Sequence, residues 1–375
     1  MTDGPAHRRS PGAREATPPI PVDTRSGDPR RIRSRFIFDD LELRAALLGA
    51  NVLGVIEFNH GCPTFTIPRG VPHVRVHMNP CDWDAIAEVW TSTGRVQYGS
   101  HGRFRYGSDG ETVFGCSSCP EGSGDLTRTA REIYDDLFAC ITALAHPQLF
   151  RVWNFFPEIN REKDGALERY KAFCLGRALS FEVNNPLDQT RRFPAATGIG
   201  STGGDICIAF LSSRQAACRH IENPRQVPAY RYPVQYGPLP PSFARATCVE
   251  ARDGCAIYVS GTAAVLGHKS TYRGDTEQQT RATCDNLELL LAGDNLARHG
   301  LVGSATPHDL SGIKVYLRRP DEDLPLVKRI CDEAFGPMRR IAYLHADVCR
   351  AELLVEIEGV VVPDSGSHAE APWFR

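Results

Sequence analysis

Long hydrophobic runs and an excess of charge of either sign are both missing from this sequence. No apolar stretch approaches the length that a transmembrane helix requires. Lysine and arginine number 43 against 45 aspartates and glutamates, for a formal net charge of -2. A chain so close to neutrality gives no reason to expect a nucleic acid or a membrane surface as partner. We therefore expect its partner to be a small molecule.

Large apolar residues are almost absent from residues 1–35, in which proline, glycine, arginine and aspartate predominate. A segment of this composition cannot bury enough apolar surface to form a core, which predicts a disordered tail. The segment also lacks the apolar stretch of a secretory signal. We therefore expect a cytoplasmic protein.

A disulfide framework is not expected either, although the chain has 13 cysteines. Their number is odd, and most stand singly inside apolar stretches, where cysteine acts as a small hydrophobic residue, as at Cys140 and Cys174. The exception is the pair Cys116 and Cys119, which suits a zinc site, a redox pair or an ordinary loop. No second pair stands at zinc-finger spacing, so we favour the loop and expect neither a metal nor another cofactor.

The hydrophobic pattern predicts an α/β (α+β) fold. Expected strands cover residues 45–58, 73–78, 149–155, 206–211, 256–260, 313–317, 341–345 and 353–361, and expected helices cover residues 125–145, 166–181, 276–291 and 322–335. Strands and helices alternate in the last part, which predicts a sheet covered by helices on one face. The first part repeats a related order less clearly. We therefore expect two similar halves, with an N-terminal domain at 36–148 and a C-terminal domain at 149–375, and we suspect the proline-rich loop 223–241 of lining a site.

An unusual pair of acids lies in the last expected strand. Side chains alternate along a strand, so Leu354, Glu356 and Glu358 should share one face, and Cys349 stands seven residues before Glu356. A half-buried glutamate there would have a raised pKa and could donate a proton near neutral pH. Alternatively the strand lies at a solvated edge and the acids have no function, which the pattern alone favours.

Two further segments combine features of a binding site with features of ordinary turns. Small residues after an expected strand, among them Gly261, Thr262 and Ala264, would let backbone amides approach a ligand or would simply form a tight turn. Arg231 and Tyr232 in the proline-rich loop would either grip a polar ligand or pack the loop.

A helical face carries Tyr170, Phe173 and Arg177 at spacings of three and four residues. An arginine on an apolar face often binds a carboxylate, because its planar guanidinium donates two parallel hydrogen bonds. The alternative, which the pattern favours equally, is that Arg177 lies at a helix end and extends its guanidinium group to water.

Several motifs occur in an order and spacing over residues 150–360 that resembles the chorismatase family. They are Tyr232-Pro with Tyr236-Gly-Pro, Ser260-Gly-Thr-Ala with Gly267-His268, Gly274-Asp275 with Gln279-Thr280 and Asn286-Leu287, Lys314-Val-Tyr, and Ala346-Asp-Val-Cys with Val-Glu-Ile-Glu358. The resemblance implies two RidA-like halves, each a mixed sheet with helices packed on one face. It leaves open whether the protein is a monomer or a trimer.

The family cleaves the enolpyruvyl ether of chorismate and releases pyruvate. By this resemblance, Glu356 protonates the methylene carbon to give an oxocarbenium ion. A cysteine at the position of Cys349 is typical of members that form 3-hydroxybenzoate, and we therefore expect that product. Tyr170, Arg177, Arg231, Tyr232, Gly261, Thr262 and Ala264 are the residues we expect to bind the substrate.

The sequence departs from the family pattern at a few positions. Ala264 stands where formers of 3-hydroxybenzoate usually have glycine, while Val234, Leu239 and Ala282 replace expected charged residues. Two other ring products therefore remain alternatives, namely 3,4-dihydroxycyclohexa-1,5-diene carboxylate, formed by hydrolysis, and 4-hydroxybenzoate. An imine deaminase or metabolite binder of the RidA type is the alternative of another class.

Overall fold

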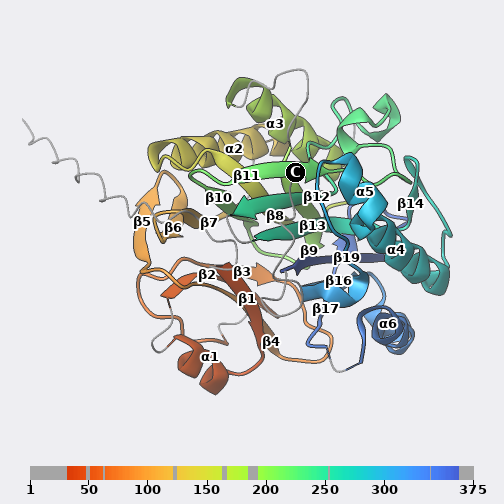
Figure 1. Cartoon of the computed structure of the whole chain (residues 1–375), viewed down its shortest axis with the longest axis horizontal. Coiled ribbons are helices and arrows are strands. Elements are labelled where there is room, and N and C mark those ends of the chain that lie inside the picture. The colour runs from red at the N-terminus through yellow and green to blue at the C-terminus, as the bar shows by residue number, and fades with distance from the viewer. Residues whose placement is uncertain are drawn as a thin grey trace, which may run out of the picture.

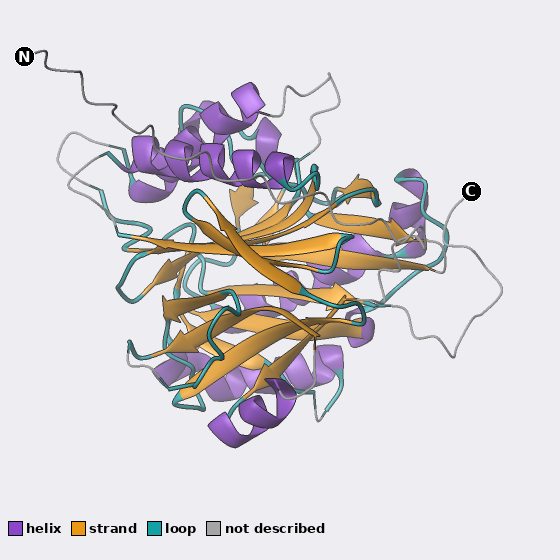
Figure 2. Ribbon diagram, turned by 90° about the vertical axis from the view of Figure 1, so that its left-hand side faces the viewer, coloured by secondary structure: helices purple, strands orange, loops and turns teal. Residues whose placement is uncertain are grey.

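The computed structural model describes residues 32–47, 51–61, 64–120, 125–162, 167–184, 193–251, 254–337 and 339–362. Three large β-sheets lie at the centre of the molecule, and helices cover their outer faces (Figures 1 and 2). None of the described helices is long and apolar enough to cross a membrane.

The C-terminal sheet has six strands in the order β11-β12-β13-β19-β16-β17. Its strands are β11 (Ala217–Ile221), β12 (Ala246–Ala251), β13 (Gly254–Ala263), β16 (Leu310–Leu317), β17 (Ala342–His345) and β19 (Val355–Val361), and its helices are α4 (Thr276–Leu291), α5 (Gly293–Arg298) and α6 (Pro320–Phe335). Asp275 caps α4 by accepting a hydrogen bond from the Gln278 amide, and Pro320 begins α6 at a position where its missing N–H costs nothing. The final strand β19 is inserted between β13 and β16, so it is an interior strand.

The sheet before it has the same topology. It contains β5 (Gln97–His101), β6 (Phe104–Ser108), β7 (Thr112–Cys119), β8 (Gln148–Pro157), β9 (Ala195–Ser201) and β10 (Ile206–Ser213), with α2 (Leu126–Ala143) and α3 (Arg169–Asn184) on one face. Here β10 is inserted between β7 and β8, and β9 runs parallel to β8, as β17 does to β16. The short β18 (Asp347–Val348) of the C-terminal half extends this sheet at β9. The prediction of a mixed α/β fold with helices packed on one face of each of these sheets is thus confirmed.

The N-terminal sheet is a shorter copy of the same arrangement. Its strands are β1 (Ile32–Ile37), β2 (Asn51–Asn59), β3 (His73–His77) and β4 (Ala85–Ser92). The helix α1 (Asp40–Leu47) connects β1 to β2. Its order β1-β4-β2-β3 matches β13-β19-β16-β17, including the parallel pair and the inserted last strand. In the described part of this copy, no strands correspond to β11 and β12 and no helix connects β2 to β3. The chain therefore contains three related units.

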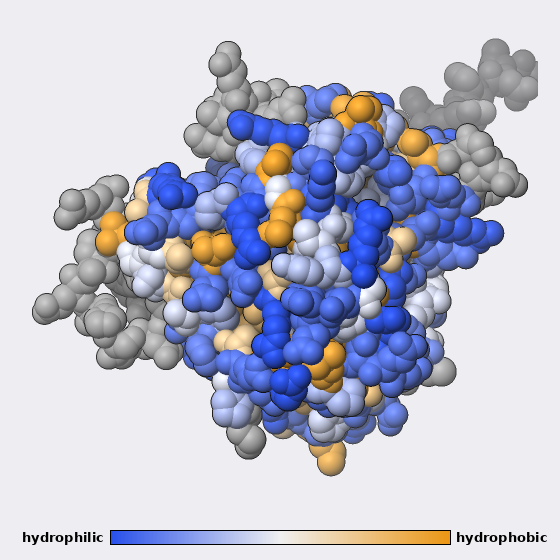
Figure 3. Space-filling model, turned by 90° about the vertical axis from the view of Figure 1, so that its right-hand side faces the viewer, coloured by the Kyte–Doolittle hydropathy of each residue, from blue (hydrophilic) through white to orange (hydrophobic). Residues whose placement is uncertain are grey.

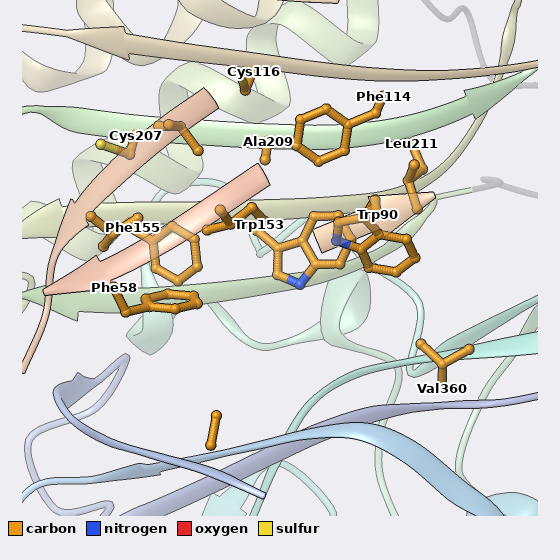
Figure 4. Close-up of a cluster of buried hydrophobic side chains, with 14 of the residues drawn as sticks. Phe58, Trp90, Phe114, Cys116, Trp153, Phe155, Cys207, Ala209, Leu211 and Val360 are labelled. Carbon is orange, nitrogen blue, oxygen red and sulfur yellow. The ribbon is translucent and has the colours of Figure 1, made fainter. Parts of the chain in front are cut away.

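The three sheets share one hydrophobic core. Figure 4 shows Phe58 and Trp90 from the N-terminal sheet next to Phe114 and Trp153 from the seven-stranded sheet, with Val360 of β19 facing them. The ring centroids of Trp90 and Trp153 are 5.3 Å apart, within the range of favourable aromatic pairs. Truncating a buried tryptophan to alanine typically costs about 3–5 kcal/mol. Separate clusters fill the space between each sheet and its own helices.

The described surface exposes few large hydrophobic side chains, because most of them lie in these buried clusters. On the face drawn in Figure 3, hydrophobic residues form small separate groups among hydrophilic ones. The most exposed large hydrophobic side chain among the described residues is that of Val234, in the proline-rich loop.

The structure corrects four predictions about the elements. The first expected strand begins too early, because residues 45–47 belong to α1 and β2 begins at Asn51. The expected tail ends too late, because β1 begins at Ile32; residues 1–31 lie outside the described residues. Strands from both sides of residue 148 share the seven-stranded sheet, so this position separates no two sheets. Cys116 and Cys119 lie in β7 rather than in a loop, and an odd spacing places them on opposite faces.

Candidate active site

A cavity of about 310 Å³ lies between the second and third units. Its walls come from α3 and β9 of the second unit, from β13 and β19 of the third, and from the proline-rich loop, which contains the short 3-10 helices η2 (Ala229–Arg231) and η3 (Val234–Tyr236). Figure 1 shows β9, β13 and β19 side by side at this place. The long loop that was expected to line a site thus lines this cavity.

Glu356, the second residue of β19, lines this cavity. The side chain is buried, with 4% of its surface exposed, and every residue of β19 is buried. Burial and, to a lesser extent, the charge of Glu358 raise the pKa of Glu356 to about 8, although the positive charges of Arg151 and Arg245 partly oppose this shift. Glu356 is therefore mostly protonated at pH 7. The alternative of a solvated edge strand is wrong.

Glu358, on the same face of β19, is in the opposite protonation state: its carboxyl group is charged at neutral pH. Its Oε1 lies 2.8 Å from Nζ of Lys314 and accepts a hydrogen bond of 2.9 Å from Nε1 of Trp153, while its Oε2 lies 2.7 Å from Nη2 of Arg151. Burial alone would raise its pKa, but Lys314 and Arg151 lower it to about 2. Two neighbouring carboxyl groups thus differ in charge at neutral pH, an arrangement typical of acid–base sites.

Lys314 links this site to the N-terminal unit. Its Nζ lies 2.5 Å from Oε2 of Glu88 in β4 and 2.8 Å from Glu358, and both of these pairs are buried. Each of the three units therefore contributes an ionisable residue to one buried network: Glu88 from the first, Arg151 from the second, and Lys314 with Glu358 from the third.

Gly261 leaves the space that the Glu356 carboxyl group occupies. A Cβ atom at Gly261 would lie 1.8 Å from Oε1 of Glu356, far closer than atoms can approach. The amide of Gly261 donates a hydrogen bond of 3.1 Å to Oγ1 of Thr197, which in turn donates to Glu358. Glycine is therefore required here for close approach of the acid and not for a special backbone angle.

Cys349 lies beside the same acid. Its Sγ is 4.0 Å from Oε2 of Glu356, and the thiol is the donor. Burial raises the pKa of Cys349, and the neighbouring Glu356 raises it further, so that the side chain remains a thiol at neutral pH. A second cysteine, Cys174, also lines the cavity, and burial raises its pKa to about 12. The sequence alone had suggested only a packing role for Cys174.

Two buried arginines supply positive charge to the cavity. Arg177 is 4% exposed, so it does not extend to water, and its Nε and Nη2 have no hydrogen-bond partner among the described residues. The second is Arg245, which the sequence pattern had not indicated as a binding residue. It is 5% exposed, donates 2.6 Å to the hydroxyl of Tyr232, and has an unpartnered Nε. Its position within the apolar segment 243–249 was the only signal that could have identified it.

Some of the predicted binding residues do not line the cavity. Arg231 is exposed and lies outside the lining, where Arg245 takes its expected place. Thr262 donates 3.0 Å to the carbonyl of Ser260, and Ala264 is fully buried behind the wall. Because this segment continues β13 instead of forming a turn, alternate residues face the cavity. The predicted residues that do line it are Tyr170, Arg177, Tyr232, Gly261, Cys349 and Glu356.

The unsatisfied polar atoms of the lining share one chemical character. In the described part of the chain they are Nε and Nη2 of Arg177, Nε of Arg245 and Nδ2 of Asn160, and all of them are donors. Buried donors are normally paired, so the lining fits a ligand rich in acceptors, such as a molecule with two carboxylates. Among the same residues no group of three or more His, Cys, Asp or Glu side chains could hold a metal ion.

Known proteins with related sequences and structures share this architecture. A family model described as the N-terminal part of FkbO/Hyg5-like chorismatases matches residues 88–212, a range close to that of the second unit. A 3-hydroxybenzoate synthase from Streptomyces hygroscopicus is 43% identical over 84% of this chain and 93% of its own length. A chorismatase from Streptomyces rapamycinicus is 37% identical over 83% of this chain and 92% of its own.

The solved structures agree. A crystal structure of a chorismatase is 35% identical, with a TM-score of 0.80, and the match covers 88% of this chain and 98% of that one. With relatives of this similarity along most of its length, the chain belongs to the chorismatase family.

Proposed function

We propose that this enzyme converts chorismate to pyruvate and 3-hydroxybenzoate. The observation that carries the proposal is a glutamic acid, Glu356, kept neutral in a cavity whose unpartnered polar atoms are all donors. Chorismate carries two carboxylates and an enol ether, and such an ether is cleaved after protonation of its methylene carbon. The curated relative named 3-hydroxybenzoate synthase supports this choice of product.

In the proposed reaction Glu356 transfers its proton to the methylene carbon of the enolpyruvyl group. A general acid works best when its pKa lies near the working pH, as it does here. The step leaves an oxocarbenium ion beside the newly formed carboxylate of Glu356, and their opposite charges attract in a site of low dielectric. Glu358 keeps its own charge throughout, because Lys314 and Arg151 stay paired with it.

The two arginines would bind the two carboxylates separately. Arg245 lines the cavity, and its positive charge opposes the rise in the pKa of Glu356, the proposed proton donor. We therefore assign it to the carboxylate of the enolpyruvyl group and Arg177, on α3, to the carboxylate of the ring. Tyr170 and Tyr232 lie in the same lining as hydrogen-bonding neighbours.

The choice of product depends on water and on Cys349. Formation of pyruvate and 3-hydroxybenzoate consumes no water, whereas formation of the diol acid consumes one molecule. The partly buried thiol of Cys349 lies beside Glu356, where it would favour the route without water. Ala264, the residue that departs from the usual signature, is fully buried outside the lining and makes no wall of this space.

Incubation of the purified protein with chorismate tests the proposal. Pyruvate is followed with a coupled lactate dehydrogenase assay, and the ring product is identified by chromatography. C349A should still release pyruvate but should change the ring product, while C119A, at a half-buried position outside the cavity, should leave both unchanged. Absence of pyruvate release by the wild-type chain would refute the proposal.

Of the two expected oligomeric states, we infer the monomer. Three related units already bury a common core within one chain. Light scattering after gel filtration should therefore give a mass near 41.4 kDa. The cytoplasmic location stays a prediction, which fractionation of the producing cells tests.

A further inference from the structure

Asn160 is a polar residue of the cavity that has no role in the reaction as described so far. It lies shortly after the end of β8 and contributes to the lining. Its Nδ2 is buried and has no hydrogen-bond partner among the described residues. A buried amide donor without a partner is uncommon, because leaving it unpaired costs the free energy of its lost hydration.

The orientation of the Asn160 amide follows from its other contact. Its Oδ1 accepts a hydrogen bond of 2.9 Å from Nη2 of Arg318. Because a guanidinium group offers donors only, the amide oxygen must face Arg318 and the amide nitrogen cannot exchange places with it. The donor is thereby directed away from Arg318 and left free for a ligand.

Arg318 is itself firmly held. Its Nε donates 2.9 Å to the carbonyl of Leu353, its Nη2 donates to the carbonyls of Val348 and Arg350, and its Nη1 pairs with Asp347. The carbonyls of Val348 and Arg350 flank Cys349 in the sequence. Arg318 therefore connects the side chain of Asn160, through hydrogen bonds, to the segment that contains Cys349.

We propose that Asn160 is a substrate-positioning residue whose Nδ2 donates a hydrogen bond to an oxygen of the ring half of the substrate, on the side of Cys349. The inference rests on the proposed function, and it assigns a residue that the family motifs do not include. The fixed amide holds the ring relative to the thiol, so its loss affects the ring product as well as the rate.

The variant N160D separates this role from a structural one. Aspartate still accepts the hydrogen bond from Arg318 and preserves that contact as an ion pair, but it replaces the donor by an oxygen that repels an acceptor-rich ligand. We expect kcat/KM for pyruvate release to fall at least about tenfold, a loss typical of one missing hydrogen bond to a ligand. The ratio of ring products should change, and the midpoint of urea unfolding should not decrease.

D347N serves as the matched control. It weakens the anchoring of Arg318 at an exposed ion pair and leaves the Asn160 amide intact, so kcat/KM and the product ratio should stay within about twofold of the wild type. Equal losses in D347N and N160D would show that loosening of the segment is the cause and would overturn the inference. A wild-type rate and product ratio in N160D would overturn it as well.

A titration that needs no turnover distinguishes this inference from the proposed function. Binding of 3-hydroxybenzoate, measured by calorimetry, should be about tenfold weaker to N160D than to the wild type. If the wild type released no pyruvate from chorismate, the proposed function would fail, and the titration would still decide the role of Asn160. Equal affinity of the two proteins would refute that role.

Discussion

Replacing Glu356 with glutamine removes a carboxyl group whose pKa differs strongly between the folded and the unfolded chain. Burial, with the charge of Glu358 in second place, raises its pKa from 4.5 to about 8 in the folded protein. A group with a raised folded pKa stabilises the fold fully below its unfolded pKa, and this contribution is lost as the pH rises through the folded pKa. The wild type therefore loses stability from this residue between about pH 4.5 and pH 8, whereas E356Q does not.

The size of the effect follows from the two pKa values. Each unit of pH between them changes the free energy of unfolding by about 1.36 kcal/mol. Between pH 5 and pH 7.5 the wild type should lose about 3 kcal/mol relative to E356Q, after allowing for partial titration at both ends. Any packing defect that glutamine introduces is the same at both pH values and cancels from this difference.

Urea unfolding at pH 5 and pH 7.5, followed by tryptophan fluorescence, measures the difference. The matched control is E288Q, which changes an exposed glutamate of α4 and should give the same stability difference from the wild type at both pH values. E356Q should also release pyruvate at a small fraction of the wild-type rate. If its stability relative to the wild type were the same at pH 5 and pH 7.5, the neutral state of Glu356 would be refuted.

Three other predictions concern the same network. The value of kcat/KM for pyruvate release should fall about tenfold per pH unit above pH 8, where Glu356 loses its proton, and a profile flat to pH 10 would contradict this. G261A should lower kcat/KM by about 10²-fold, because its Cβ displaces the Glu356 carboxyl, whereas G203A, where a Cβ would meet no atom closer than 3.8 Å, should be active. K314M should lower the free energy of unfolding by about 3–5 kcal/mol in urea titrations, since it removes the cation paired with buried Glu88 and one of the two cations paired with Glu358; a loss below about 1 kcal/mol would show that the network is dispensable.

Local patterns were sufficient for several features. The period of two along residues 353–361 correctly placed Glu356 and Glu358 on one face, because alternation is a property of any strand. The helix expected at residues 276–291 agrees with α4 at both ends, since its capping aspartate is a local signal. The length and proline content of the loop at 223–241 singled out a segment that lines the cavity.

Other features depend on contacts between distant residues. Whether a glutamate of β19 is neutral or charged follows from which cations reach it, and Arg151 and Lys314 lie far from it in the sequence. Arg231 and Arg245 are equally charged and only 14 residues apart, yet one is exposed and the other lies in the cavity wall. The short N-terminal unit was not recognised as a third copy, because its relation to the others lies in the pairing order of its strands.

The sequence by itself thus determined the family resemblance, the alternation of helices and strands, and the acid and thiol at the centre of the proposed chemistry. Only the tertiary structure decided that Glu356 is protonated beside a charged Glu358, that Arg245 and not Arg231 lies in the cavity wall, and that Asn160 lines the same cavity. The physical reason is that side-chain pattern is local, whereas burial, pairing and pKa depend on the distance to charges and surfaces that the three sheets bring together.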